Sequence, residues 1–184
     1  MKTQNYELEV GLMKVRAKKR RRKLIVSLLL WVFCIWGLLY RMYGICSVHG
    51  NSMRPAFCSG DVLFYRRGIH QELQYGDVVI IDSKLDGMYV KRIVGIPGDM
   101  IEVNERGYLT RNGEQIEEPE VRYGNQMTDY DTVIFPYVVP EGEYFYLGDN
   151  RGVSLDSRIL GSTRQQNIKG TVIGLIRLGQ HPER

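Results

Sequence analysis

The chain contains few of the residues that usually bind metals or form disulfides. Its 184 residues include three cysteines, and its three histidines, His49, His70 and His181, are scattered without HExxH or CxxC spacing. Three cysteines are too few for a disulfide scaffold, and we expect no zinc site and no cofactor. Because no GxxxxGK[ST] or GxGxxG motif follows a predicted strand, we do not expect a bound nucleotide either.

Most of the chain also lacks a surplus of positive charge. The formal net charge is +4, but residues 1–23 carry nine basic and two acidic groups, whereas the other 161 residues hold 16 basic and 19 acidic groups. A protein that coats nucleic acid spreads its positive charge over the folded surface. We therefore expect no nucleic-acid partner.

The longest uncharged run follows this basic segment. Leu24 to Tyr40, LIVSLLLWVFCIWGLLY, has no charge and no proline. As a helix it would span roughly 25 Å, and residues 41–43 can extend it to the interface of a hydrocarbon core about 30 Å thick. Eight cations in the ten preceding residues place residues 1–23 in the cytoplasm by the positive-inside rule. We expect a single-pass helix over 24–43 in the cell membrane, with residues 44–184 on the extracytoplasmic side.

Other interpretations of this run are weaker. A buried core helix does not explain the cations before it. A cleaved leader would have a long apolar core and a mediocre cleavage site after Cys46, and a lipoprotein would need a small residue where Ile45 stands. We therefore expect a retained anchor in the lipid bilayer. Whether Cys46 and Cys58 form a disulfide outside the membrane stays open.

Residues 44–184 are expected to form a mainly β domain. Short apolar runs repeatedly follow Gly-Asp turn pairs, and Asn112-Gly113 is a strong hairpin signal. The more polar stretch at about 104–143 predicts an inserted β subdomain, and a short helix is expected within Leu155–Thr163. The predicted strands include Val78–Ile81, Met88–Val94, Tyr144–Leu147 and Thr171–Leu178.

Lysine is scarce in this domain. After Arg41 the chain has only Lys84 and Lys169, both in polar turns, and Lys91, which lies in the middle of a predicted strand. Lys91 shares a strand face with Tyr89 and Ile93. On spacing alone, we favour the interpretation that Lys91 protects an edge strand from pairing with another chain over the interpretation that it is partly desolvated.

Two further segments carry reactive side chains. Ser52 follows the flexible Gly50-Asn51 pair and precedes Met53, and residues 148–158, GDNRGVSLDSR, pack hydroxyls, carboxylates and guanidiniums after a strand. Singly, each segment is typical of an ordinary turn.

In this order, the segments resemble the bacterial type I signal peptidases (peptidase family S26), which are membrane-anchored serine proteases with a Ser-Lys dyad. The matching stretches are S-M-x-P at Ser52–Pro55, Y-V-K-R-I-V-G-I-P-G-D at Tyr89–Asp99, and G-D-N-R-x-x-S-x-D-S-R-x-x-G at Gly148–Gly161. With the anchor, the resemblance covers nearly the whole chain. Two positions depart from it: Ala56 stands where threonine is usual, and Gly50 offers no side-chain hydroxyl to an oxyanion.

The resemblance implies a signal-peptidase-like antiparallel β fold that removes signal peptides from secreted preproteins. Ser52 would be the nucleophile and neutral Lys91 the general base. Ser154 would hydrogen-bond the lysine, and a pair of Asp156 and Arg158 would fix the loop that carries Ser154. The other expected residues shape the loop or bind the oxyanion and the substrate strand: Asp149 and Asn150 for the loop, and Gly50, Asn51, Met53, Met88, Tyr89 and Val90 for the oxyanion and substrate.

Three rival functions fit the sequence less well. A catalytically dispensable accessory protein of pilus assembly should lack the serine or the lysine, and both are present. A self-cleaving Ser-Lys repressor would need a DNA-binding domain where the apolar run stands. A Ser-His hydrolase would use His49, which on a strand faces away from Ser52.

Overall fold

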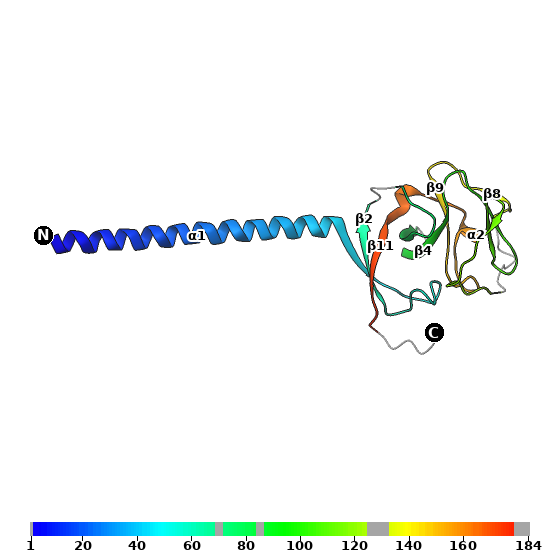
Figure 1. Cartoon of the computed structure of the whole chain (residues 1–184), viewed down its shortest axis with the longest axis horizontal. Helices are drawn as coiled ribbons and strands as arrows, with labels where there is room; N and C mark the ends of the chain where they lie inside the picture. The colour runs from blue at the N-terminus through cyan, green and yellow to red at the C-terminus, as the bar shows by residue number, and fades with distance from the viewer. Residues whose placement is uncertain (1, 69–71, 84–86, 125–132, 179–184) are drawn as a thin grey trace. The chain divides into compact units, whose positions relative to one another are not determined.

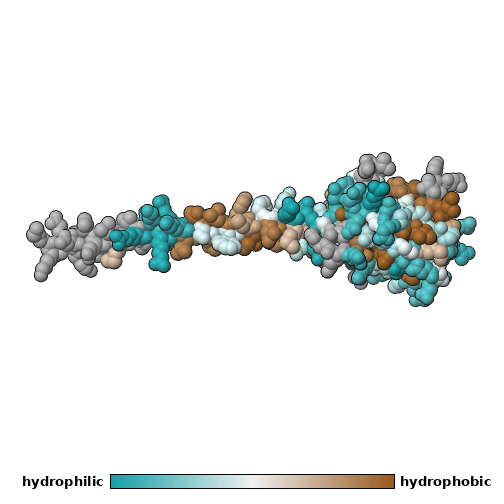
Figure 2. Space-filling model, turned by 90° about the horizontal axis from the view of Figure 1, so that it is seen from above, coloured by the Kyte–Doolittle hydropathy of each residue, from teal (hydrophilic) through white to brown (hydrophobic). Residues whose placement is uncertain are grey.

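A computed structural model describes residues 2–68, 72–83, 87–124 and 133–178, and the chain divides into a helical unit up to Met42 and a β unit from Tyr43 onward (Figure 1). In the helical unit, helix α1 runs without interruption over Lys2–Met42. Its segment Lys18–Met42 is long and apolar enough to cross a membrane, and its side chains are exposed (Figure 2). A wholly exposed apolar helix is stable in lipid rather than in water.

The β unit is built around a seven-stranded antiparallel sheet with the order β1-β2-β11-β3-β4-β9-β10. Strand β11 joins the two halves, because it pairs with β2 on one side and β3 on the other. The strands are β1 (Tyr43–Ser47), β2 (Val62–Arg67), β3 (Val78–Ser83), β4 (Gly87–Gly95), β9 (Glu143–Leu147), β10 (Thr163–Arg164) and β11 (Ile168–Ile176).

A second sheet has four strands in the order β7-β6-β5-β8. Asn112 (φ 54°) and Gly113 (φ 85°) form the predicted tight turn between β6 and β7, since both take the left-handed conformation that a type I′ hairpin requires. The strands are β5 (Met100–Val103), β6 (Leu109–Arg111), β7 (Glu114–Gln115) and β8 (Tyr137–Val138). The described part of the β unit also contains two short helices, α2 (Ser157–Leu160) and the 3₁₀ helix η1 (Gln165–Asn167).

Two hydrophobic clusters form the core, and β4 contributes to both. Ile93 packs in a cluster with Val79, Ile81 and Tyr146, whereas Val94 packs in a cluster with residues of the second sheet. Successive residues of a strand point to opposite faces. Lys91 therefore lies on the Ile93 face, and Arg92 lies on the face of the second sheet.

The expected mainly β fold behind an N-terminal apolar helix is confirmed, as is the short helix within 155–163. The interpretation of Lys91 as an edge-strand charge is wrong. Lys91 is only 3% exposed and therefore presents no charge to solvent, although β4 pairs with β9 only from Arg92 onward. Local spacing cannot show this, because the burial of a side chain depends on segments that are distant in sequence.

Candidate active site

Ser52 lies in a turn that follows a left-handed glycine. Gly50 has φ +89°, a conformation that residues with a Cβ rarely adopt. The backbone at this position therefore favours glycine over a residue with a side-chain hydroxyl. Met53, next to the serine, is 2% exposed and anchors the turn in the core. The Met53 carbonyl accepts a hydrogen bond from the Phe57 amide at 2.8 Å. Ser52 itself is half-buried, and Asn51 before it is exposed.

Lys91 contacts Ser52 from strand β4. Lys91 Nζ lies 2.9 Å from Ser52 Oγ, although the two residues are 39 positions apart in the chain. The ammonium also lies 5.5 Å from the centre of the Tyr89 ring. The two residues predicted as nucleophile and base are therefore within hydrogen-bonding distance.

Burial changes the acidity of this lysine. Desolvation lowers the pKa of Lys91 from its ordinary 10.5 to about 8; Arg158 also lowers it, while Asp156 and Asp149 raise it. Roughly one molecule in ten then holds a neutral Lys91 at pH 7, against roughly one in 3,000 at the ordinary pKa. The physical cause is the loss of water around the ammonium.

Ser154 is close to the Ser52 turn but does not make the expected bond. Its side-chain oxygen is buried and has no hydrogen-bond partner among the described residues, so the expected bond to Lys91 is not formed. Ser154 instead packs against Gly148. A methyl group on Gly148 would collide with Ser154 Oγ and with the Ser52 carbonyl oxygen. Only glycine lets these three segments approach so closely.

The expected pair of Asp156 and Arg158 is present and fully buried. Arg158 Nε donates to Asp156 Oδ1 at 2.8 Å, and Arg158 Nη2 donates to Asp156 Oδ2 at 3.0 Å. The Asp156 side chain also caps helix α2 and accepts a hydrogen bond from the Gly148 amide. A second donation from Arg158 Nη2 reaches the Arg151 carbonyl at 2.7 Å. One ion pair thus holds both ends of the 148–158 loop.

Asp149 and Asn150 hold the front of this loop. The two oxygens of Asp149 accept bonds of 2.8 and 2.7 Å from Arg92 in a bidentate ion pair. The Asn150 amide donates to the Ser52 carbonyl at 2.9 Å, and its side chain donates to the Asn51 carbonyl at 3.1 Å. The loop is therefore fastened directly to the serine turn.

Strand β4 offers a free edge beside the dyad. Its pairing with β9 begins at Arg92, so among the described strands none pairs with this side of β4 at Met88 or Val90, and Tyr89 lies between them. Met88 is 56% exposed, and the other two are half-buried. An extended peptide can add to such an edge through main-chain hydrogen bonds.

Other candidate groups lie apart from this arrangement. His49 is exposed, and its ring bonds to the Ser47 carbonyl at 3.2 Å rather than to Ser52. Cys46 and Cys58 are free thiols. No cluster of three or more metal-ligating side chains occurs in the described ranges.

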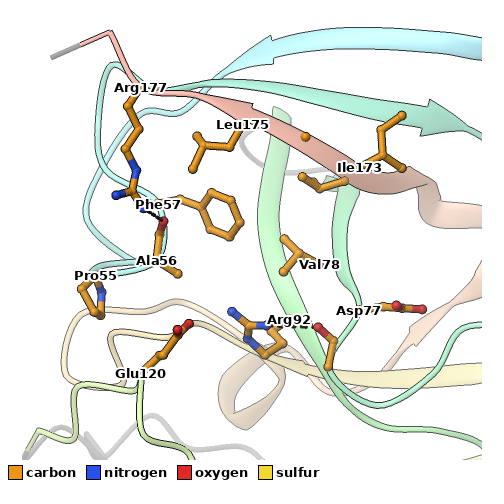
Figure 3. A pocket seen from close by; sticks show the side chains of 13 residues that line it. Pro55, Ala56, Phe57, Asp77, Val78, Arg92, Glu120, Ile173, Leu175 and Arg177 are labelled. Carbon is orange, nitrogen blue, oxygen red and sulfur yellow. Dashed lines mark hydrogen bonds between the residues drawn. The ribbon is translucent and has the colours of Figure 1, made fainter.

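A cavity of about 670 Å³ lies on the Arg92 face of the sheet, where Arg92 and Glu120 stand below Phe57, Val78 and Leu175 (Figure 3). Ser52 and Lys91 do not line it. The dyad therefore lies outside this cavity, beside the free β4 edge.

Sequence reasoning missed Arg92, Arg151 and Gly148 as parts of the site. All three belong to the quoted motifs, but no role was assigned to them. Their contacts join segments far apart in the chain: Arg92 bonds Asp149 across 57 positions, and Arg151 bonds Glu118 across 33. The sequence signal that could have identified the two arginines is a charged side chain within an otherwise apolar or turn-forming stretch.

Comparison with known proteins adds an independent observation. The profile of the signal peptidase family, peptidase S26, matches residues 19–176. The signal peptidase I of Bacillus licheniformis is 34% identical over 158 residues, covering 81% of this chain and 83% of that protein. Signal peptidase IB of Staphylococcus aureus is 34% identical over 145 residues, covering 68% and 73% of the two chains.

Among solved structures, a signal peptidase I of Enterococcus faecalis matches with a TM-score of 0.44 and 29% identity. The match covers 56% of this chain and 98% of that one.

Proposed function

Because the chain belongs to the signal peptidase family, peptidase S26, we propose that Ser52 and Lys91 are the dyad with which it cleaves preproteins. The chain is a serine peptidase that removes signal peptides, and its substrates are preproteins that carry them. The relatives named above are peptidases, and no comparison supports the alternative accessory role in pilus assembly. The observation that carries the dyad is the 2.9 Å contact between Lys91 Nζ and Ser52 Oγ.

In the proposed mechanism, neutral Lys91 accepts the proton of the Ser52 hydroxyl as Oγ attacks the scissile carbonyl. The acyl-enzyme forms when the carbon–nitrogen bond breaks and the Lys91 ammonium returns the proton to the leaving amine. Water then hydrolyses the ester, again with Lys91 as base. The Ser52 amide would stabilise the oxyanion, and with Gly50 at position 50 no side-chain hydroxyl assists there.

The surroundings of the dyad take supporting roles in this proposal. The 148–158 loop keeps water from Lys91 and fixes the Ser52 turn through Asn150, with Asp149 and Asp156 held by their arginines. The substrate would lie as an extended strand along Met88 to Val90, antiparallel or parallel to β4, with the turn at Asn51 on its other side. Ser154 would hydrogen-bond Lys91 after a rotation of its hydroxyl side chain, because its oxygen is otherwise unpaired.

The protein is anchored in a membrane by its N-terminal apolar helix. We assign residues 1–23 to the cytoplasm, residues 24–43 to the span and residues 44–184 to an extracytoplasmic catalytic domain, with an inserted subdomain at about 104–143. The basic residues Lys18 to Lys23 are exposed at the start of the apolar segment, which supports this orientation by the positive-inside rule.

The dyad is tested with purified full-length enzyme and a small panel of preproteins. Ser52→Ala and Lys91→Ala should each lower the cleavage rate by more than about a thousandfold, because each removes one half of a unit. Circular dichroism and membrane retention should be unchanged. A Lys91→Ala variant that cleaves at the normal rate would exclude lysine as the base.

The orientation is tested with reporters fused to the C-terminus. A phosphatase that folds only outside the cytoplasm should be active, and a cytoplasm-dependent fluorescent reporter should be dark. The reverse pattern would place the catalytic domain in the cytoplasm.

A further inference from the structure

A segment from the region of the second sheet is fastened to the 148–158 loop. In this segment, residues 116–124 (the arm), the Arg122 amide donates to the Asp149 carbonyl at 2.8 Å. The Arg151 amide returns a bond of 3.0 Å to the Arg122 carbonyl, which makes a parallel bridge. A methyl group on Gly124 would lie 3.0 Å from the Gly152 Cα, so the two backbones are also in close contact. The arm and the loop form one packed unit.

The side chain of Arg151 ties this unit together. It is 1% exposed, and its three nitrogens each donate a hydrogen bond to a different segment. Nε bonds the Gly148 carbonyl at 3.0 Å, Nη1 bonds the Gly107 carbonyl at 2.7 Å, and Nη2 bonds Glu118 Oε1 at 2.7 Å. The guanidinium thus joins the loop, the β5–β6 turn and the arm.

Glu118 supplies the charge that this buried arginine needs. Its side chain is 5% exposed, and its second oxygen is buried without a hydrogen-bond partner in the described part of the chain. A buried guanidinium tolerates the loss of water only when a carboxylate compensates its charge. Glu118 lies outside all three motifs of the resemblance, so no motif assigns it a role.

From Arg151 the contacts lead to the nucleophile in two steps. The Gly148 carbonyl that Arg151 holds belongs to the glycine packed between Ser154 Oγ and the Ser52 carbonyl. The neighbouring Asn150 amide bonds that same Ser52 carbonyl at 2.9 Å. A shift of Arg151 therefore displaces the groups that set the position of Ser52 relative to Lys91.

We propose that Glu118 is a positioning residue, which acts through Arg151 to hold the 148–158 loop against the Ser52 turn. This inference rests on the proposed dyad and adds the arm to the parts that the reaction requires. Glu118 does not touch the reacting atoms. Its loss should impair the chemical step more than substrate binding, because the free β4 edge lies on a different segment.

The direct test is Glu118→Gln in the full-length enzyme, with Glu117→Gln as the matched control, since Glu117 is the exposed neighbour. The amide keeps the size of the side chain but removes its charge. We expect kcat to fall about ten- to a hundredfold, as for a misplacement of reacting groups by about 1 Å. KM should change less than about twofold, and the control should match the wild type.

The pH profile separates positioning from loss of folded protein. Asp156, Asp149 and Arg158 of the loop all act on the pKa of Lys91, and burial lowers it. A loosened loop admits water, so the midpoint of the acid limb of kcat/KM should move to higher pH in Glu118→Gln. A smaller folded fraction would scale the whole profile and leave the midpoint in place.

A double-mutant cycle tests whether the two residues act together. Arg151→Lys cannot make the three-way contact, and we expect the same selective loss of kcat. The double variant Glu118→Gln/Arg151→Lys should lose no more than about the larger single loss. If the loss of kcat in the double variant equals the product of the two single losses, the residues act separately and the proposal is overturned.

Two further results would also overturn it: a kcat of Glu118→Gln within twofold of the Glu117→Gln control, or a loss of kcat with an unmoved acid limb. Failure of the dyad itself gives a different result, because Ser52→Ala would then still cleave.

Discussion

Two buried cations of the β domain, Arg158 and Lys91, differ in what neutralises them. Arg158 is 2% exposed and forms a bidentate pair with Asp156, which is not exposed at all. Lys91 is 3% exposed, but its hydrogen bond goes to the neutral hydroxyl of Ser52. No ion pair between described side chains includes Lys91.

Contact with a carboxylate distinguishes the arginines of this domain from Lys91. Arg92 and Arg151 follow the pattern of Arg158, with Asp149 and Glu118 as their carboxylates, and hydrogen bonding to Asp149 raises the pKa of Arg92. These arginines serve as fixed ties between segments of the domain. Lys91 has no carboxylate in contact, so desolvation prevails and lowers its pKa toward neutrality. One domain thus contains both paired arginines and a lysine whose pKa is lowered to about 8.

The largest effect on stability is expected from removing the charge of a paired carboxylate. Asp156→Asn leaves Arg158 buried with an uncompensated charge, which should cost about 3–5 kcal/mol of unfolding free energy. Urea unfolding of the full-length protein in detergent, followed by the fluorescence of its aromatic side chains, measures the change.

The exposed pair of Asp82 and Lys169 provides the control for that measurement. Their side chains are 46% and 48% exposed and lie 2.6 Å apart. Asp82→Asn should cost under about 1 kcal/mol, because water screens a surface pair. Equal losses in the two variants would contradict the distinction between buried and exposed pairs.

Replacing Lys91 is expected to change the unfolding free energy in the opposite direction. The shift of its pKa from 10.5 to about 8 corresponds to roughly 3 kcal/mol of destabilisation at pH 7. Lys91→Met removes the buried ammonium and should therefore stabilise the fold at pH 7 while abolishing cleavage. A stability loss at pH 7 would show that the ammonium is compensated by contacts.

The stabilisation expected for Lys91→Met decreases as the pH rises. Because the folded state has the lower pKa, the unfolded chain binds more protons between about pH 8 and 10.5. The destabilisation of the fold by the buried Lys91 ammonium is complete below pH 8 and disappears as the pH rises to 10.5. The advantage of Lys91→Met should therefore shrink to under about 1 kcal/mol by pH 10.

Much of the fold could be predicted from local patterns. The β-branched run at residues 78–81, the Asn112-Gly113 turn and the apolar run at residues 24–40 each specify an element through backbone preference or hydrophobicity. The order of strands in the sheet and the burial of Lys91 could not be predicted. Both are determined by the packing of segments that are distant in sequence.

The candidate site was predictable only in part. Ser52 and Lys91 came from the order of the motifs, and the pair of Asp156 and Arg158 came from the same resemblance. The tie between Glu118 and Arg151 could not be found, because Glu118 lies in a polar stretch with several other glutamates and only tertiary contact distinguishes it. The missing bond of Ser154 likewise depends on side-chain packing against Gly148.

We propose that Lys91 acts as a neutral base because it is buried with no carboxylate in contact. The most direct test is the pH dependence of kcat/KM for a preprotein, which reports groups of the free enzyme. We predict an acid limb with a midpoint near pH 8, the pKa of Lys91, and a fall of about tenfold for each pH unit below it. A rate that stays constant from pH 5 to 9 would contradict the account.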